Sequence, residues 1–190
     1  MVKVIASDVR KGNVLEQEDG QLYTVLKAET YRPGKGTPTA TIDMRRISDG
    51  VKVSERWKTT DQVERAFVED RDFNFLYEDG DGFHFMNNET YEQIAIDGKI
   101  INAPDFLLEG MTVKIAVRAE DEMPLTCDLP ATVVVEVTYA EPGIKGDTAT
   151  NTLRPCTVST GAKVMIPLFI NIGDKIKINT ETGDYMERVK

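Results

Sequence analysis

Short segments in which apolar and polar residues alternate, each bounded by a turn sequence, recur along this chain. Residues 21–26 alternate with a period of two, directly after a turn at 18–20. Segments of this kind spaced about 8–12 residues apart are typical of small β-barrels and β-sandwiches. Segments with a helical period are few, and residues 104–108 are expected to form one short helical turn. The pattern therefore predicts an all-β protein.

The same two-residue period predicts most of the remaining strands. Residues 73–77 and 82–86 flank Glu-Asp-Gly-Asp at 78–81, which is typical of a hairpin turn. Another hairpin is expected where residues 175–179 lead into the turn at 180–184. The other predicted strands are 39–44, 51–53, 112–117 and 131–139.

The length of the chain, 190 residues, is enough for one large barrel or for several small ones. Two breaks favour small ones: the polar stretch 59–64, and residues 123–130, which contain two prolines. We therefore predict three small β-barrels in series, at 1–64, 65–128 and 129–190. Units of about 62–64 residues have the size at which partly open five-stranded barrels of the OB type fold.

Composition excludes several classes of function. The chain has 23 Lys and Arg against 32 Asp and Glu, and this net charge of −9 argues against a protein that coats nucleic acid. The chain has one His and two Cys, Cys127 and Cys156, which is too few for a multi-histidine metal site or a zinc module. We expect both cysteines to be reduced and to serve in packing. We find no apolar run long enough for a signal peptide or a bilayer span, so we expect a cytoplasmic protein without a membrane partner.

Charge is unevenly distributed between the three predicted barrels. Residues 1–64 carry a net charge of +1, residues 65–128 carry −10, and residues 129–190 carry 0. Within the first barrel, residues 27–46 carry a net +3. The basic residues of that segment are Lys27, Arg32, Lys35, Arg45 and Arg46. A basic hairpin on an acidic body can orient a protein on a large charged partner. Arg45 and Arg46 are therefore candidates for RNA contacts. The alternative is that these charges only keep the surface solvated.

The segment 31–38, Tyr-Arg-Pro-Gly-Lys-Gly-Thr-Pro, lies between two predicted strands. Pro33 fixes one φ angle, while Gly34 and Gly36 allow turn conformations closed to other residues. Lys35 is thus expected at a hairpin apex without a bulky neighbour. The segment lacks the glycine spacing of a phosphate-binding P-loop, and a turn tip lacks the desolvation that a Schiff-base lysine needs. On these residues alone, an ordinary turn with a solvated lysine remains open.

Five segments of the chain match, in order, the motifs of one family. The first is Pro-Gly-Lys-Gly at 33–36, and the second is Phe-His-Phe-Met-Asn-Asn-Glu-Thr-Tyr-Glu-Gln at 83–93. The third is Gly-Ile-Lys-Gly-Asp-Thr at 143–148, and the last two span 160–173 and 183–190. Five motifs at the expected positions are far more specific than one tetrapeptide. The whole chain resembles the bacterial elongation factor P family.

The resemblance implies both an architecture and a function. The architecture is an N-terminal KOW-like, SH3-like barrel followed by two OB-type barrels, with an outline like that of a transfer RNA. The function is that of a translation elongation factor that binds the 70S ribosome between the peptidyl and exit sites and relieves stalls at consecutive prolines. The resemblance further implies a monomer that is not an enzyme and needs no cofactor.

The same resemblance assigns a role to the tip. Lys35, framed by Arg32, Pro33, Gly34 and Gly36, would reach the peptidyl-transferase centre and steady the CCA end of the peptidyl-tRNA. Members of the family commonly carry a β-lysyl group on this lysine, which implies a lysine-modifying enzyme as a second partner. Proline is a constrained nucleophile, so restoring productive geometry would lower an entropic barrier without bond-making by Lys35.

The resemblance also implies contacts made by the third barrel. Gly146, Asp147 and Thr148 would approach the mRNA codon in the exit site. Tyr185 and Arg188 would contact RNA or hold the last barrel together.

Two other functions remain as alternatives. A general single-stranded nucleic-acid-binding OB protein combines a basic groove with aromatic platforms, which the net charge of −10 in residues 65–128 fits poorly. An enzyme that uses Lys35 as a nucleophile is the other, and trapping with borohydride would detect it.

Overall fold

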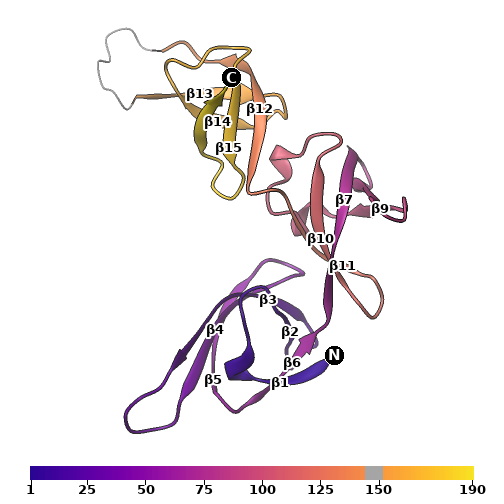
Figure 1. The fold of residues 1–190 in the computed structure, drawn as a ribbon, viewed down its shortest axis with the longest axis vertical. Helices are drawn as coiled ribbons and strands as arrows, with labels where there is room; N and C mark the ends of the chain where they lie inside the picture. Colours follow the sequence, from indigo (N-terminus) through magenta and orange to yellow (C-terminus); the bar gives the residue numbers. More distant parts are fainter. Residues whose placement is uncertain (144–151) are drawn as a thin grey trace. The chain divides into compact units, whose positions relative to one another are not determined.

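The computed structural model describes residues 1–143 and 152–190, and in these ranges the chain is built from β-strands (Figure 1). Three single-turn 3₁₀ helices, η1 (Ala6–Asp8), η2 (Gly98–Ile100) and η3 (Pro104–Phe106), complete the described elements. The last of these is the short helical turn predicted at 104–108. The chain divides into two compact units, 1–71 with 115–127, and 72–114 with 128–190. The all-β prediction is confirmed.

The first sheet has the strand order β1-β6-β2-β3-β4-β5 in the described chain. Its strands are β1 (Val2–Ile5), β2 (Val14–Glu16), β3 (Leu22–Tyr31), β4 (Thr39–Arg46), β5 (Lys52–Lys58) and β6 (Gln62–Ala66). Every second residue of the central strands faces inward, so the alternation seen in the sequence builds the core. The core residues are Val9, Leu15, Tyr23, Val25, Ile42, Met44 and Val63.

The second sheet has the order β11-β10-β7-β8-β9. Its strands are β7 (Val68–Asp79), β8 (Gly82–Asn87), β9 (Gln93–Ile96), β10 (Thr112–Arg118) and β11 (Pro124–Asp128). Phe75 and Phe85, directly opposite each other on β7 and β8, are buried with ring centroids 5.3 Å apart. This is the hairpin predicted around residues 78–81.

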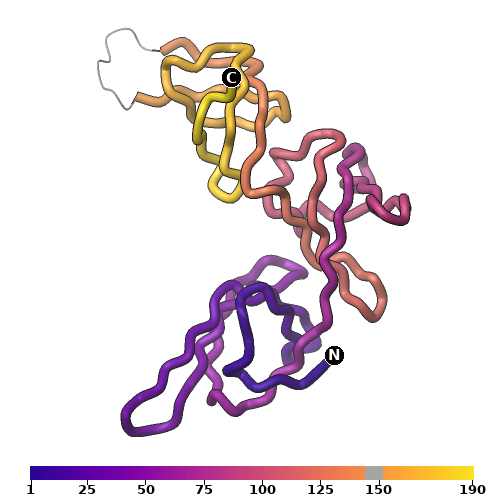
Figure 2. Tube along the Cα trace, viewed as in Figure 1, coloured from indigo at the N-terminus to yellow at the C-terminus, as the bar shows by residue number. Residues whose placement is uncertain are grey.

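The third sheet has the order β14-β13-β12-β15-β16 in the described chain. Its strands are β12 (Thr132–Ala140), β13 (Leu153–Val158), β14 (Lys163–Pro167), β15 (Lys175–Asn179) and β16 (Tyr185–Val189). Ile176 and Ile178 on β15 are fully buried and pair with Val135 and Val133 of β12, which are buried as well. The strands predicted at 131–139 and 175–179 are thus present as β12 and β15. The Cα trace in Figure 2 shows the hairpin that β15 forms with β16.

Both sequence stretches that we interpreted as breaks contain strands. Residues 62–66 form β6, which pairs with β1 on one side and β2 on the other, and its Val63 and Ala66 are buried. Residues 124–128 form β11, whose Leu125 is fully buried. Val14, Ala66 and Leu125 form one buried cluster, which explains why residues 115–127 belong to the first compact unit. The boundaries at 64/65 and 128/129 remain predictions.

The cysteines behave as packing residues. Cys127 and Cys156 are buried, at 0% and 2% exposure, in two different sheets, and neither forms a disulfide bond. Burial raises the pKa of the Cys156 thiol, because the thiolate loses hydration. Among the described residues, no helix has the length and apolarity needed to cross a membrane.

Candidate functional site

The hairpin formed by β3 and β4 carries the predicted tip. Its register runs from Tyr23 opposite Arg46 to Tyr31 opposite Thr39. Leu26 is an extra residue on β3, because the register shifts between Val25 and Lys27. Burial alternates on β3 up to Val25, and beyond the bulge no residue of this strand is fully buried. On β4, Ile42 and Ala40 are still buried opposite this part of β3, so only the end of the hairpin around residues 32–38 extends past the core, as the violet loop of Figure 1 shows.

Residues 32–38 form the tip, and one of its two glycines has a special conformation. Gly36 has φ +117°, a region that L-residues rarely adopt, and a Cβ there would lie 3.5 Å from Cγ of Pro33. Gly34 lacks a positive φ, and a Cβ there would meet nothing within 4 Å. Of the two tip glycines, which both allow turn conformations closed to other residues, only Gly36 has such a conformation here.

Lys35 lies where the sequence predicted it. Its side chain is exposed, and it forms no hydrogen bond or ion pair with the described residues. Arg32 is also exposed, and Pro33 is half-buried. Lys27, nearer the core on the same strand, is neutralised instead: its Nζ lies 2.8 Å from Oε1 of Glu29, and this hydrogen bond raises the pKa of Lys27. The tip therefore carries two positive charges, Arg32 and Lys35, that have no ion-pair partner among the described residues.

Arg46 has structural partners. Its Nε donates a hydrogen bond to Oη of Tyr23 at 3.0 Å, its guanidinium carbon lies 5.6 Å from the centre of that ring, and Nη1 lies 3.0 Å from Oδ2 of Asp49. The Tyr23 hydroxyl in turn donates to Asp19 at 3.0 Å. The hydrogen bond to Tyr23 raises the pKa of Arg46. Arg46 thus fastens the base of the hairpin to two turns, which leaves it less available to RNA than its neighbour.

Arg45 lies on the opposite face of β4. It is exposed, pairs in register with Lys52 of β5, and forms no ion pair with the described residues. On β5, Lys52, Arg56 and Lys58 occupy alternate positions and are all exposed. Because alternate residues of a strand share a face, these three basic side chains line the same outer surface as Arg45. We name Arg45, Lys52, Arg56 and Lys58 the basic face.

The three β5 members of the basic face are not evident from an excess of charge in consecutive residues, because Ser54 and Glu55 dilute the excess there. The detectable signal was the period of two in Lys-Val-Ser-Glu-Arg-Trp-Lys at 52–58, which places basic residues on one face and Val53 and Trp57 on the other.

Tyr185 and Arg188 of the third sheet lie on one face of β16. Residues three apart in a regular strand face opposite ways, but here the register shifts: Tyr185 pairs with Ile178 and Arg188 with Ile176. Met186 is the extra residue that produces this shift. Arg188 is exposed, and its Nη1 lies 3.9 Å from Oδ2 of Asp174, a weak ion pair. The other candidates of the last barrel, Gly146, Asp147 and Thr148, lie outside the described residues.

The motif at 83–93 has a structural role. Asn87 is buried, and its Oδ1 accepts hydrogen bonds from the backbone N–H groups of Glu89 and Thr90 at 2.8 and 3.1 Å. Tyr91, with φ +59°, completes the turn into β9. A buried side-chain acceptor that satisfies two backbone donors fixes the turn, so the residue types of this motif follow from the fold.

Three family models match successive parts of the chain. They describe the Elongation factor P KOW-like domain at residues 5–63, the Elongation factor P OB domain at 68–124, and the Elongation factor P C-terminal domain at 133–188. The KOW-like model contains the β3–β4 hairpin with Lys35. The OB model covers β7 to β10 of the second sheet, and the C-terminal model covers nearly all of the third. The architecture of a KOW-like barrel followed by OB-type barrels is confirmed.

Curated relatives match over their full length. The chain is 53% identical to Elongation factor P of Rhizobium meliloti over 191 residues and 52% identical to Elongation factor P of Caulobacter vibrioides over 190 residues, with both chains fully covered in each case. Among solved structures, Eukaryotic translation initiation factor 5A from Methanococcus jannaschii has a similar fold, with a TM-score of 0.52 at 20% identity, over 66% of this chain and 93% of that chain. With all three family models in order and full-length relatives above 50% identity, the chain belongs to the elongation factor P family of translation elongation factors.

Proposed function

We propose that the chain binds the ribosome between the peptidyl and exit sites and promotes peptide-bond formation at polyproline stalls, with Lys35 steadying the CCA end of the peptidyl-tRNA. The observation that carries this proposal is the position of Lys35: an exposed, unpaired ammonium at the end of a hairpin that extends beyond its own core. Membership of the elongation factor P family supports a role in translation.

The hairpin provides reach. β5 pairs with β4 as far as Thr39, and Ala40 of β4 is buried, so the sheet stays three-stranded up to the start of the tip. Only the tip loop of residues 32–38 lies beyond these strands. A narrow loop of this kind can enter a channel that excludes the whole barrel.

The chemistry at the tip is positional. A lysine with no neighbouring base and no desolvating pocket is a poor nucleophile at neutral pH, so Lys35 makes no covalent bond to substrate. It contributes a mobile positive charge that holds phosphates or carbonyl oxygens of the CCA end in place. Fixing the reactants in a productive geometry removes an entropic part of the barrier, which is largest for a constrained nucleophile such as proline.

The exposed tip also supports covalent extension of Lys35 by a β-lysyl group. A modifying enzyme must approach the ε-amine freely, and no described side chain shields it. The added residue lengthens the reach and contributes a further amine. We propose that this group is the one covalent addition the site requires and that no other cofactor takes part.

The basic face supplies contacts with RNA backbone alongside the tip. Arg45, Lys52, Arg56 and Lys58 are exposed on a single surface of the hairpin sheet, and such arrays bind phosphates without reading sequence. In the third barrel we propose that Gly146, Asp147 and Thr148 approach the exit-site codon, with Tyr185 and Arg188 contacting RNA nearby.

A reporter that requires translation through Pro-Pro-Pro tests the proposal. In cells that lack their own elongation factor P, Lys35→Ala should abolish rescue while leaving the thermal unfolding midpoint unchanged, because an exposed tip contributes little burial. Lys11→Ala, which removes an equally exposed lysine outside the hairpin, is the matched control and should retain rescue. Full rescue by Lys35→Ala would refute the mechanism.

Mass spectrometry of the native protein tests the modification. An added mass of one lysyl residue, mapped by fragmentation to Lys35, is expected. An unmodified Lys35 in a protein that still rescues the reporter would show that the bare lysine suffices.

A further inference from the structure

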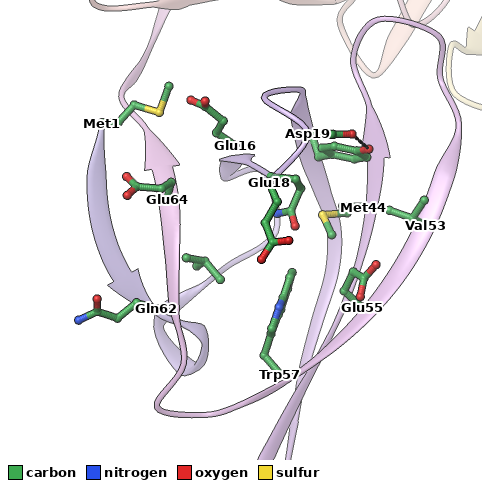
Figure 3. A pocket seen from close by; sticks show the side chains of 13 residues that line it. Met1, Glu16, Glu18, Asp19, Met44, Val53, Glu55, Trp57, Gln62 and Glu64 are labelled. Carbon is green, nitrogen blue, oxygen red and sulfur yellow. Dashed lines mark hydrogen bonds between the residues drawn. The ribbon is translucent and has the colours of Figure 1, made fainter.

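The first sheet is not closed into a complete barrel. Its strand order ends with β1 on one side and β5 on the other, and within the described chain β5 pairs with β4 alone. Beside β5 lies a hollow of about 820 Å³ (Figure 3). Its lining comes from β5 and β6, single residues of β2, β3 and β4, the turn after β2, and Met1. The hollow is therefore bordered on one side by the edge strand β5.

The hollow has an apolar floor and an acidic rim. Tyr23, Met44 and Val63 form the buried floor, and the half-buried Trp57 forms part of one wall. Five carboxylates line it: Glu16, Glu18, Asp19, Glu55 and Glu64. The described lining residues include no Lys or Arg, and the N-terminal ammonium of Met1 is already paired with Glu120 at 2.7 Å. A ligand that fits this surface carries positive charge on an apolar stem.

Three of these carboxylates have no partner within the described chain. Glu64 lies 3.9 Å from Nζ of Lys3, and Asp19 accepts a hydrogen bond from the Tyr23 hydroxyl. Glu16, Glu18 and Glu55, by contrast, form no ion pair or side-chain hydrogen bond with the described residues. In Figure 3 the carboxylate of Glu18 points toward the indole of Trp57. A cation between them would contact a carboxylate on one side and an aromatic ring on the other, an arrangement that favours ammonium and guanidinium groups.

The strand next to the hollow has two faces of opposite character. Glu55 and Trp57 face the hollow, whereas Arg56 and Lys58 belong to the basic face. A strand added to the free edge of β5 would present its side chains alternately to these two faces. Charge complementarity then requires basic residues at the inward positions and acidic residues at the outward positions.

We propose that the opening beside β5 binds an extended segment of a partner protein in which Lys or Arg alternates with Asp or Glu. The basic side chains enter the hollow toward Glu18, Glu55 and Trp57, and the acidic ones pair with Lys52, Arg56 and Lys58. The backbone of the segment completes the hydrogen-bonding edge of β5. This site lies apart from the tip, so it goes beyond the function proposed above.

Other occupants fit less well. A polyamine satisfies the carboxylates but offers no backbone to the strand edge and nothing to the basic outer face. A second copy that paired through its own β5 would bring Lys52, Arg56 and Lys58 against like charges, which is unfavourable across a sheet.

Tryptophan fluorescence tests the proposal directly, because Trp57 is the single tryptophan of the chain. The intact protein is titrated with a seven-residue peptide of alternating Glu and Lys, and with a peptide of the same composition in which Lys and Glu form two blocks. The alternating peptide should change the Trp57 emission and bind at least about tenfold more tightly than the blocked one. Equal affinities would overturn the proposal.

Backbone pairing is tested with two N-methylated forms of the alternating peptide. Each carries methyl groups on alternate amides, so only one of them blocks the amides that would face β5. One form should lose binding and the other should retain it; equal binding by both would refute strand addition. Spermidine that reproduces the emission change with the affinity of the peptide would show a simple cation site and overturn the assignment to a peptide.

Side-chain variants identify the inward contacts. Glu55→Gln should weaken binding of the alternating peptide about fivefold, as expected for one partly exposed ion pair. Glu89→Gln, which removes an exposed carboxylate in the turn between β8 and β9, is the control and should have no effect. An unchanged affinity for Glu55→Gln would place the peptide elsewhere, and circular dichroism confirms that both variants are folded.

Discussion

Arg46 and Tyr23, directly opposite each other on β4 and β3, are joined by a hydrogen bond of 3.0 Å and by stacking of the guanidinium over the ring. The adjacent Arg45 faces the other way and has no such partner among the described residues. Two consecutive arginines thus have different roles: the half-buried Arg46 is held by protein partners, and Arg45 faces solvent.

The Arg46–Tyr23 pair should matter for stability. Tyr23 is 4% exposed, so Tyr23→Phe removes a hydrogen-bonded hydroxyl from a largely buried position and should lower the free energy of unfolding by about 1 kcal/mol. Arg46→Ala should also destabilise the protein, whereas Arg45→Ala should not. Urea unfolding of the three variants measures this, and equal stability of Arg45→Ala and Arg46→Ala would contradict the assignment.

The basic face should determine how ribosome binding depends on salt. Replacing Arg45, Lys52, Arg56 or Lys58 by Ala should weaken binding, and it should reduce the slope of log affinity against log salt concentration by up to about 1 for each phosphate that the side chain neutralises. Co-sedimentation with ribosomes over a series of salt concentrations gives the slopes. Lys99→Ala, in the second unit, is the control. Slopes identical to that of the parent protein would show that these side chains are only solvated.

The two glycines of the tip should differ in their tolerance to substitution. Gly36→Ala forces an L-residue into φ near +117° and should cost about 1 kcal/mol or make the tip rearrange. Gly34→Ala should have little effect on stability, because its φ is ordinary and its Cβ would meet open space. Thermal unfolding and the Pro-Pro-Pro reporter measure both variants. A Gly34→Ala variant that is impaired as strongly as Gly36→Ala would mean that Gly34 serves a close approach to the ligand.

The turn between β10 and β11 should contribute to acid sensitivity. Nε and Nη2 of Arg118 donate to the two oxygens of Asp121, and this hydrogen bonding lowers the pKa of Asp121 to about 2. The folded-state pKa lies below the ordinary value, so this contribution to stability is present above about pH 4 and is lost as the pH falls toward 2. Because the pair is exposed, the effect on stability is small.

Titration by NMR measures the pKa of Asp121 directly. Arg118→Gln should move it back toward the ordinary range, and it should make stability less dependent on pH between 4 and 2. A pKa that stays near 2 in this variant would assign the shift to the backbone of the turn.

Eight of the sixteen described strands could be predicted from the sequence, because their side chains alternate in polarity between clear turns. They are β3, β4, β5, β7, β8, β10, β12 and β15. β6 and β11 could not be recognised as strands. The polar residues Gln62, Glu64 and Arg65 make β6 resemble a linker, and the two prolines of residues 123–130 make β11 resemble a break between domains. Their buried residues, Val63 and Leu125, are recognisable only once the neighbouring strands are in place.

The tip of the site was predictable, but its surroundings were not. Lys35 follows from local turn chemistry, which needs only neighbouring residues. The difference between Arg45 and Arg46 depends on strand register and on Tyr23, which lies 23 residues away from Arg46. Likewise, Met186 brings Tyr185 and Arg188 to one face through a bulge that no local pattern indicates.

The bulge at Leu26 and the strict alternation beyond it limit how the hairpin can vary in length. Inserting one residue into each arm would turn every distal side chain, and the plane of the tip loop, to the opposite face. Two residues per arm would restore the original orientation and move the tip by about 7 Å. The distance from the core to Lys35 can therefore change only in coarse steps, and finer adjustment must come from lengthening the lysine itself.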